Sequence, residues 1–308
     1  MHLIWLGTQR EIYPMKFLRH SLEKIIPMSC YGEPCLRSGQ RCEEFKEDYD
    51  LKGILDTNKE ADALIVDFNK GTTWNSWKYK STDILKVAII YDAIQDFASF
   101  IPRLREWEFD IVCLTQGSKE LTALYETLYP SKYYTLPFSI DPEVFKCEER
   151  KRRDLDCVLI GAMTSDGYPF RMKICEYLNN EKKGPIVASD KKLAIETYVH
   201  YLNRAKISPF CSSIYKYVLA KYWEGMFCKT LVMADQPMEV PGTLLRSGYN
   251  YVEISTKNFK REIDYYLEHE DERNTIIENA YSYVVQYHTS DIRARQFKEI
   301  IEEGLGSR

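Results

Sequence analysis

The stretch that decides the fold is residues 212–252, which read SSIYKYVLAKYWEGMFCKTLVMADQPMEVPGTLLRSGYNYV. Its first part has the spacing of a helix, and the apolar run at 231–234 predicts a strand after that helix. The phrase GYNYV at 248–252 predicts a hairpin-like return. We expect one helix face to pack and the other to open into a cleft. The open face carries Tyr217, Lys221, Glu224 and Cys228, and the packed face carries Leu219, Trp223, Met226 and Phe227.

This pattern resembles the C-terminal half of the CgeB-like glycosyltransferases, a group-1 branch of the GT-B superfamily. The resemblance implies an α/β fold of two Rossmann-like domains facing a cleft, with a nucleotide-sugar held by the second domain. It is carried by Lys221, Glu224, Gly225, Leu231, Val232, Met233, Ala234 and Asp235, followed by Gly248, Asn250, Tyr251 and Val252.

The alternation of apolar runs and helical patterns agrees with that fold. In the first half, strands are expected at 63–68, 85–91, 109–115 and 133–137, because continuous apolar runs suit parallel strands that are covered on both faces. Crossover helices are expected at 97–107 and 118–128, the second capped by Ser118 with Leu121, Leu124 and Leu128 on one side. No GxGxxG follows a strand, which counts against an NAD or FAD enzyme.

The second half repeats the alternation. Strands are expected at 155–161, 185–188 and 207–211, and helices at 170–178, 193–205 and, as one long helix, 258–288. The phrase at 136–145 resembles the close of the first domain in GT-B enzymes. We therefore expect a first, acceptor-side domain at 1–145, a nucleotide-sugar-binding domain at 150–290, and a crossover helix and tail at 291–308.

Composition narrows the class of partner. The net charge of −4 and the pI near 5.9 argue against a nucleic-acid partner. No apolar run approaches the roughly 18 residues that a membrane span needs, so a cytoplasmic protein is expected. The nine cysteines are scattered and predict reduced thiols. Cys30, Cys35 and Cys42 lack a CxxC pair, and no metal site is expected.

The resemblance assigns residues to the donor diphosphate. Gly161 ends a strand and begins the family's glycine turn, and Arg171 is the first candidate for the diphosphate because a guanidinium offers a rigid fork of donors. The alternative for Arg171 is an exposed arginine in a first helical turn. Ser212 and Ser213 either cap the next helix or hold the diphosphate at its positive end.

Lys221 and Glu224 are expected to act together. Lys221 neutralises the departing nucleoside diphosphate while Glu224 accepts hydrogen bonds from the ribose hydroxyls; the alternative is a simple ion pair within the helix. Asn250 and Tyr251 stand at the family's donor-site positions. Lys216 replaces the first of the two glutamates of retaining relatives, so it contacts phosphate or lies on the surface, and the stereochemical outcome stays open.

An inverting transferase needs a general base from the first domain. Asp92, at the end of LKVAIIYD, is the first candidate for this base, and Asp67, at the end of ALIVD, is the second candidate and is also assigned to the acceptor side. Capping of a turn is the alternative for both. Trp74 and Trp77 lie within the expected surface loop GTTWNSWKYK and are candidates for an acceptor platform, since indoles stack on sugar rings; core packing is the alternative.

The sequence therefore predicts a hexosyl- or pentosyltransferase that uses a nucleoside-diphosphate sugar, with UDP favoured and GDP possible. The acceptor is a hydroxyl of a glycan or another molecule, and the donor is a co-substrate, so no cofactor is expected. Two alternatives stay open: a non-catalytic sugar-nucleotide or glycan-binding module, and a sugar-nucleotide epimerase.

Overall fold

The computed structural model describes residues 1–7, 13–31, 51–68, 83–148, 153–188 and 193–308. The chain divides into two compact units, each built from segments that are not consecutive. Unit 1 comprises Met1–Phe138, Val240–Gly242 and Arg293–Arg308, and unit 2 comprises Ser139–Glu239 and Thr243–Ile292.

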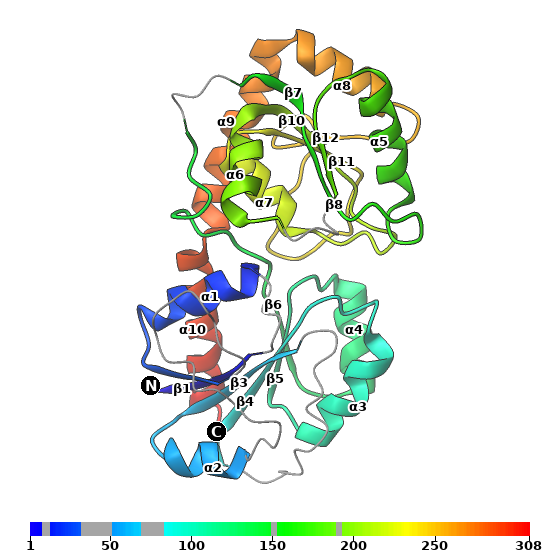
Figure 1. Cartoon of the computed structure of the whole chain (residues 1–308). Coiled ribbons are helices and arrows are strands. Elements are labelled where there is room, and N and C mark those ends of the chain that lie inside the picture. The colour runs from blue at the N-terminus through cyan, green and yellow to red at the C-terminus, as the bar shows by residue number, and fades with distance from the viewer. Residues whose placement is uncertain (8–12, 32–50, 69–82, 149–152, 189–192) are drawn as a thin grey trace. The chain divides into compact units, whose positions relative to one another are not determined.

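The described strands of unit 1 form a six-stranded parallel sheet in the order β2-β1-β3-β4-β5-β6 (Figure 1). The four strands expected in the first half are confirmed as β3 to β6, with ends that shift by no more than two residues; β1 and β2 were not predicted. The strands are β1 (Leu3–Leu6), β2 (Met28–Tyr31), β3 (Ala63–Phe68), β4 (Leu85–Ile90), β5 (Ile111–Leu114) and β6 (Lys132–Thr135).

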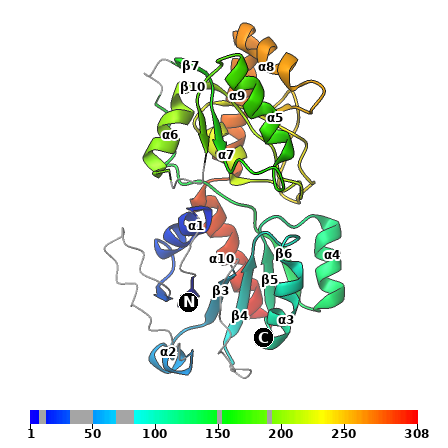
Figure 2. The ribbon, with the colours of Figure 1, turned by 45° about the vertical axis from the view of Figure 1, so that its right-hand side comes forward.

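Helices cover both faces of this sheet, as fully buried parallel strands require. On one face, α3 and α4 contribute Phe100 and Tyr125 to an apolar cluster with Ala88 of β4. Helix α10 lies on the other face (Figure 2). Its Phe297 ring meets the Trp5 ring of β1 edge-on, with the ring centroids 6.4 Å apart. The helices are α1 (Tyr13–Glu23), α2 (Leu51–Thr57), α3 (Phe97–Trp107), α4 (Lys119–Leu128) and α10 (Ser290–Gly306).

Helix α4 has the N-cap that the sequence predicts, but only part of the apolar face that it predicts. The Ser118 hydroxyl accepts a hydrogen bond from the Leu121 amide at 3.1 Å, which confirms the predicted N-cap. Leu121 is buried, whereas Leu124 is exposed. The buried face of α4 therefore does not include all three of the leucines predicted to form it.

Unit 2 is also a parallel α/β unit. The strand predicted at 155–161 is interrupted at Val158: β7 pairs with β10, and β8 pairs with β9. The Val158 amide donates to the Ile207 carbonyl at 3.0 Å, so the two parts lie in one run. The strands are β7 (Leu155–Cys157), β8 (Leu159–Gly161), β9 (Ile186–Ala188), β10 (Ala205–Pro209), β11 (Leu231–Ala234) and β12 (Val252–Glu253).

The helices of unit 2 also lie on both faces of its sheet (Figure 1). Ile174 of α5 and Ile263 of α8 belong to a cluster with Ile207 and Met233, while Gly225 of α7 packs against Val232 on the opposite face. The helices are α5 (Pro169–Asn180), α6 (Ile195–Arg204), α7 (Ala220–Phe227), α8 (Phe259–Glu268) and α9 (Glu270–Tyr287).

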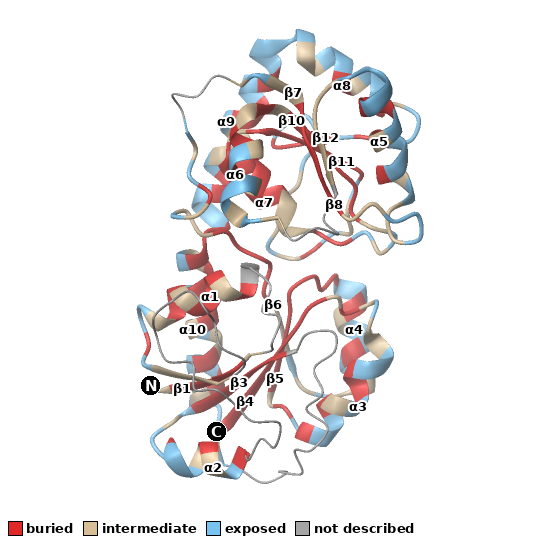
Figure 3. Ribbon diagram, viewed as in Figure 1, coloured by how far each residue is buried: buried red, intermediate tan, exposed pale blue. Residues whose placement is uncertain are grey.

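Three local expectations for unit 2 are wrong. The return at 248–252 is not a hairpin, because β12 runs parallel to β11. The long helix predicted over 258–288 is two helices separated at His269. Finally, α7 has no open face along most of its length, since every residue from Tyr222 to Phe227 is buried (Figure 3).

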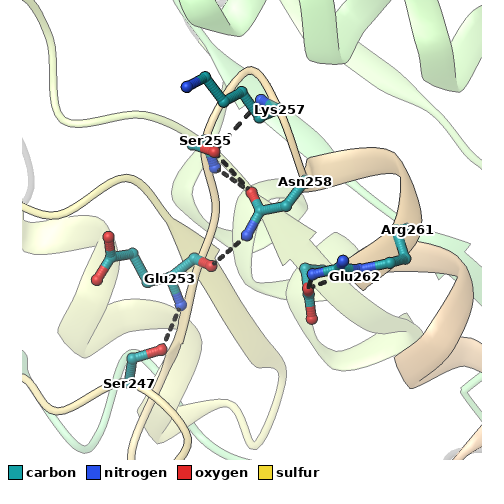
Figure 4. Close-up of polar contacts among 7 residues, drawn as sticks. All are labelled: Ser247, Glu253, Ser255, Lys257, Asn258, Arg261 and Glu262. Carbon is teal, nitrogen blue, oxygen red and sulfur yellow. Dashed lines mark hydrogen bonds and ion pairs between the residues drawn. The ribbon is translucent and has the colours of Figure 1, made fainter.

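Side-chain hydrogen bonds fix the turn that leads from β12 into α8. Asn258 Oδ1 accepts from the Ser255 amide at 2.6 Å and from its hydroxyl at 2.9 Å, and Asn258 Nδ2 donates to the Glu253 carbonyl (Figure 4). Ser247 in turn accepts from the Glu253 amide at 2.9 Å. These bonds satisfy both the amide and the carbonyl of Glu253, the last residue of β12, at the point where the sheet ends.

A substitution at Gly304 tests how α10 packs on the sheet of unit 1. A Cβ at this position would lie 2.6 Å from Cδ1 of Ile111 and 3.0 Å from Cδ2 of Leu85. Replacing Gly304 by Leu should therefore overpack the core and lower the free energy of unfolding by about 1–3 kcal/mol. Gly306, with open space around its Cα, provides the matched control. Denaturant unfolding of G304L and G306L should give a clear loss only for G304L; equal losses would show that α10 does not pack as described.

Candidate functional site

The candidate site of unit 2 lies where its strand order reverses. With β7 and β8 as one run, the order is β9, β7/β8, β10, β11 and β12, so the chain moves outward in both directions from the line between β8 and β10. In open parallel sheets, ligands bind beyond the carboxyl ends of the strands at such a reversal. Here those ends are Gly161 of β8 and Pro209 of β10.

Gly161 brings two cationic side chains against the backbone at this point. Its φ of +150° is accessible to glycine at low cost. A Cβ there would lie 2.5 Å from Nη1 of Arg171 and 3.6 Å from Cε of Lys221. Three of the residues that the sequence assigned to the donor side of the reaction, Gly161, Arg171 and Lys221, are therefore neighbours in space.

Arg171 is buried, with only 1% of its surface exposed, so the alternative of an exposed arginine in a first helical turn is wrong. Its guanidinium donates from Nη1 to the Ala162 carbonyl at 2.9 Å and from Nη2 to the Cys211 carbonyl at 3.1 Å. The same group lies over the ring of Tyr168, 3.8 Å from its centroid. Arg171 thus joins the loops that follow β8 and β10, and places a permanent positive charge behind them.

Lys221 and Glu224 are linked through a third residue that the sequence did not single out. The Tyr198 hydroxyl, from α6, donates to Glu224 Oε2 and lies 3.5 Å from Lys221 Nζ. Among the described side chains there is no ion pair between Lys221 and Glu224 within 4.0 Å, so the predicted alternative of an intrahelical pair is wrong. No motif marks Tyr198, which stands in an ordinary amphipathic helix.

Burial shifts the pKa values of this cluster. It raises the pKa of Glu224, an effect that the charge of Lys221 and the hydrogen bond from Tyr198 partly offset. It lowers the pKa of Lys221, with Glu224 opposing that shift and Arg171 adding to it. The pKa of Tyr198 lies well above its ordinary value because of burial and the adjacent Glu224, so its hydroxyl remains a donor.

The loop between β10 and α7 is organised by Asp235 at the carboxyl end of β11. Asp235 Oδ1 accepts from the Ser212 amide at 2.6 Å and from the Ser212 hydroxyl at 3.0 Å, while Oδ2 pairs with Lys216 Nζ. Helix α7 begins only at Ala220, with Leu219 as its N-cap, so neither serine caps it, contrary to the prediction. Ser213 and Lys216 have left-handed backbone angles, φ +47° and +57°, a strained arrangement that recurs at binding loops.

Asn250 and Tyr251 shape the turn after this loop. Asn250 Oδ1 accepts from the Arg246 amide at 2.9 Å, and Nδ2 donates to the Leu244 carbonyl at 2.7 Å. The Tyr251 ring lies edge-on to Tyr222, 5.9 Å away. Both residues are buried, and these contacts give each of them a structural task.

The candidates of unit 1 stand at the carboxyl ends of its strands. Asp92 lies two residues beyond the end of β4 and has a left-handed φ of +56°. Its amide donates to Oε1 of Gln116, which lies beyond the end of β5, at 2.8 Å. Asp67 is buried near the end of β3. Trp74 and Trp77 lie outside the described residues, as do Cys35 and Cys42.

The structure also gives findings on metals, thiols and membranes. Within the described ranges, no cluster of three His, Cys, Asp or Glu could hold a metal ion. The described cysteines are free, and burial raises the pKa of several, including Cys113 and Cys228. No described helix combines the length and apolar character that crossing a membrane requires.

The residues of this site lie within the part of the chain that matches a known protein family. The profile of the family described as glycosyl transferase-like matches residues 145–299, which include the strand ends and helices just described. No curated protein matches the chain in sequence.

Solved structures resemble the whole chain in fold. A glycosyltransferase from Rickettsia africae superposes with a TM-score of 0.68 at 13% identity, over 100% of this chain and 99% of that one. Sucrose-phosphate synthase from Thermosynechococcus elongatus gives 0.71 at 10% identity over 100% of both chains. Anabaena HepE in complex with UDP-glucose gives 0.61 at 11%, again over 100% of both. These likenesses confirm the predicted two-domain α/β fold of the GT-B class.

Proposed function

The chain belongs to the glycosyl transferase-like family, whose profile spans residues 145–299, and on that premise we propose that it transfers a hexosyl or pentosyl group from a nucleoside-diphosphate sugar to an acceptor hydroxyl. One observation carries the proposal: Gly161 brings Arg171 and Lys221 together at the strand reversal of unit 2. A diphosphate gains negative charge as the sugar leaves, and fixed positive charge at that place stabilises the transition state.

The two cations have different tasks in this proposal. Both Nη atoms of Arg171 donate to backbone carbonyls, so its charge acts from behind the loops without direct contact. Lys221 is only partly buried, and an ammonium with three donors suits a phosphate oxygen. In the neighbouring loop, the Ser213 hydroxyl and the N–H groups of the Lys216 ammonium that do not bond to Asp235 supply further donors. Ser212 supports this loop through its hydrogen bonds to Asp235.

The remaining donor residues recognise the nucleoside. Glu224 accepts hydrogen bonds from the ribose hydroxyls, and Asn250 and Tyr251 support the wall beside it. UDP is the favoured nucleotide, since HepE, which shares the fold, was solved with UDP-glucose; GDP is the alternative to test. The scheme requires no metal, because Lys221 and Arg171 supply the positive charge. Membership of the CgeB-like branch is part of the proposal.

Unit 1 supplies the general base and the acceptor contacts in this scheme. Asp92 accepts the proton of the acceptor hydroxyl as that oxygen attacks the anomeric carbon of the donor. Its left-handed backbone is a costly conformation held by the Gln116 hydrogen bond, which supports a functional role. The acceptor is a hydroxyl of a glycan or another molecule, with Asp67, Trp74 and Trp77 as contact candidates.

Binding of UDP tests the proposed role of Lys221. Lys221→Met should weaken binding by about 1.5–3 kcal/mol, the value of a hydrogen bond to a charged group, which is a ten- to hundredfold rise in Kd. Lys229→Met is the matched control, since Lys229 is also a partly buried lysine of unit 2 and lies 4.7 Å from the Tyr281 ring centroid, much as Lys221 lies 4.9 Å from that of Tyr198.

Isothermal titration calorimetry with UDP and GDP in EDTA measures both variants. Binding of either nucleotide that Lys221→Met weakens and Lys229→Met leaves unchanged supports the donor site. Equal effects in the two variants, or no binding of either nucleotide, would contradict it. Conversion of a UDP-sugar without any acceptor would point to an epimerase instead.

A second variant separates catalysis from binding. Asp92→Asn should keep UDP affinity and lower sugar transfer by roughly 10²–10⁴-fold, the usual contribution of a general base. Asp96→Asn, four residues along in the same unit, is the control and should keep its turnover. The assay is release of UDP from UDP-sugars in the presence of a panel of sugar acceptors. Unchanged release by Asp92→Asn would exclude this base, and donor binding by the wild type without any release would favour a binding module.

A further inference from the structure

Tyr198 lies between two opposite charges. Its hydroxyl donates to Glu224 Oε2, and Lys221 Nζ lies 3.5 Å from the same oxygen and 4.9 Å from the ring centroid. Phe145 packs edge-on against the ring at 6.2 Å. The hydroxyl therefore uses its proton for the carboxylate and turns its lone pairs toward the ammonium.

Lys221 and Glu224 would ordinarily pair with each other. Residues three apart on a helix are neighbours, and an ion pair between them gains strength where water is excluded. Lys221 is partly buried and Glu224 is buried. Within the described part of the chain, the Glu224 carboxylate nevertheless accepts its hydrogen bond from Tyr198 and forms no ion pair with Lys221. The positive charge of Arg171, close to the same glycine, also favours movement of Lys221 toward Glu224.

We propose that Tyr198 is a positioning residue that holds Lys221 and Glu224 apart, so that the ammonium stays beside Gly161 for the donor diphosphate. The inference rests on the proposed function for its ligand. The hydroxyl satisfies the carboxylate with a neutral donor, which leaves the charge of Lys221 uncancelled at short range. Without that hydroxyl, the carboxylate would recruit the ammonium, and the anion site would lose its contact group.

Tyr198→Phe removes the hydroxyl and keeps the ring. Inorganic pyrophosphate is the probe, because it lacks the ribose that Glu224 is proposed to bind. Tyr198→Phe should weaken pyrophosphate binding about tenfold, the equivalent of one lost hydrogen bond to a charged group. The double variant Tyr198→Phe/Glu224→Gln should recover most of the affinity, since a neutral amide does not capture the ammonium. Tyr281→Phe, which likewise removes a hydroxyl from a ring that lies beside a lysine, Lys229, is the control.

The recovery distinguishes positioning from packing, because a purely structural loss would not be reversed by neutralising Glu224. An unchanged affinity in Tyr198→Phe, or a double variant as weak as the single one, would overturn the proposal. If Tyr198→Phe folds poorly, Phe145→Leu removes the ring's packing partner and keeps the hydroxyl. Folded Phe145→Leu should then bind pyrophosphate normally, and an equal loss would show that packing is the cause.

A crystal structure of Tyr198→Phe gives a readout that needs no ligand. A direct ion pair between Lys221 Nζ and Glu224 is expected, and an ammonium that stays beside Gly161 would refute the positioning role. This measurement also separates the inference from the proposed function. If wild-type protein binds neither UDP nor pyrophosphate but Lys221 moves in the variant, the diphosphate site is wrong and the separation of charges by Tyr198 stands.

Discussion

The second unit depends on the hydrogen bonds that the buried guanidinium of Arg171 donates to two backbone carbonyls. The guanidinium satisfies the carbonyls of Ala162 and Cys211, groups that follow two strands at the reversal of the sheet and would cost free energy if they were buried without donors. Only a residue without Cβ at Gly161 leaves room for it. The glycine, the arginine and the loop geometry therefore require one another, and the charge at the strand ends is a consequence of how those ends are held together.

That fixed charge explains the arrangement around it. Burial penalises the charged forms of Lys221 and Glu224, and the Tyr198 hydroxyl limits the penalty for the carboxylate without a direct ion pair. Asp235 performs a similar task one strand away, where it binds Ser212 and Lys216. Each carboxylate thus orders a loop or a side chain, and the cations retain capacity for an anion.

The sequence predicted the elements that depend on local apolar patterns and on helix capping. Apolar runs located β3 to β6, and Ser118 located the start of α4, because these features are local. The prediction for helix α7 was wrong, because the spacing of Lys221 and Glu224 indicated an open face whereas tertiary packing buries every residue from Tyr222 to Phe227. The partners of Arg171, which lie 9 and 40 residues away, and the placement of Tyr198 arise only when distant segments meet. No single-sequence pattern records them.

The central claim is that the strand reversal of unit 2 binds a diphosphate, and a crystal structure with UDP tests it most directly. The account predicts a phosphate oxygen within about 2.7–3.2 Å of Lys221 Nζ, the range of a hydrogen bond. It also predicts that Arg171 keeps its two carbonyl partners behind the ligand. A diphosphate bound away from Gly161 and Lys221, or one that draws Arg171 out of its buried position, would contradict the account.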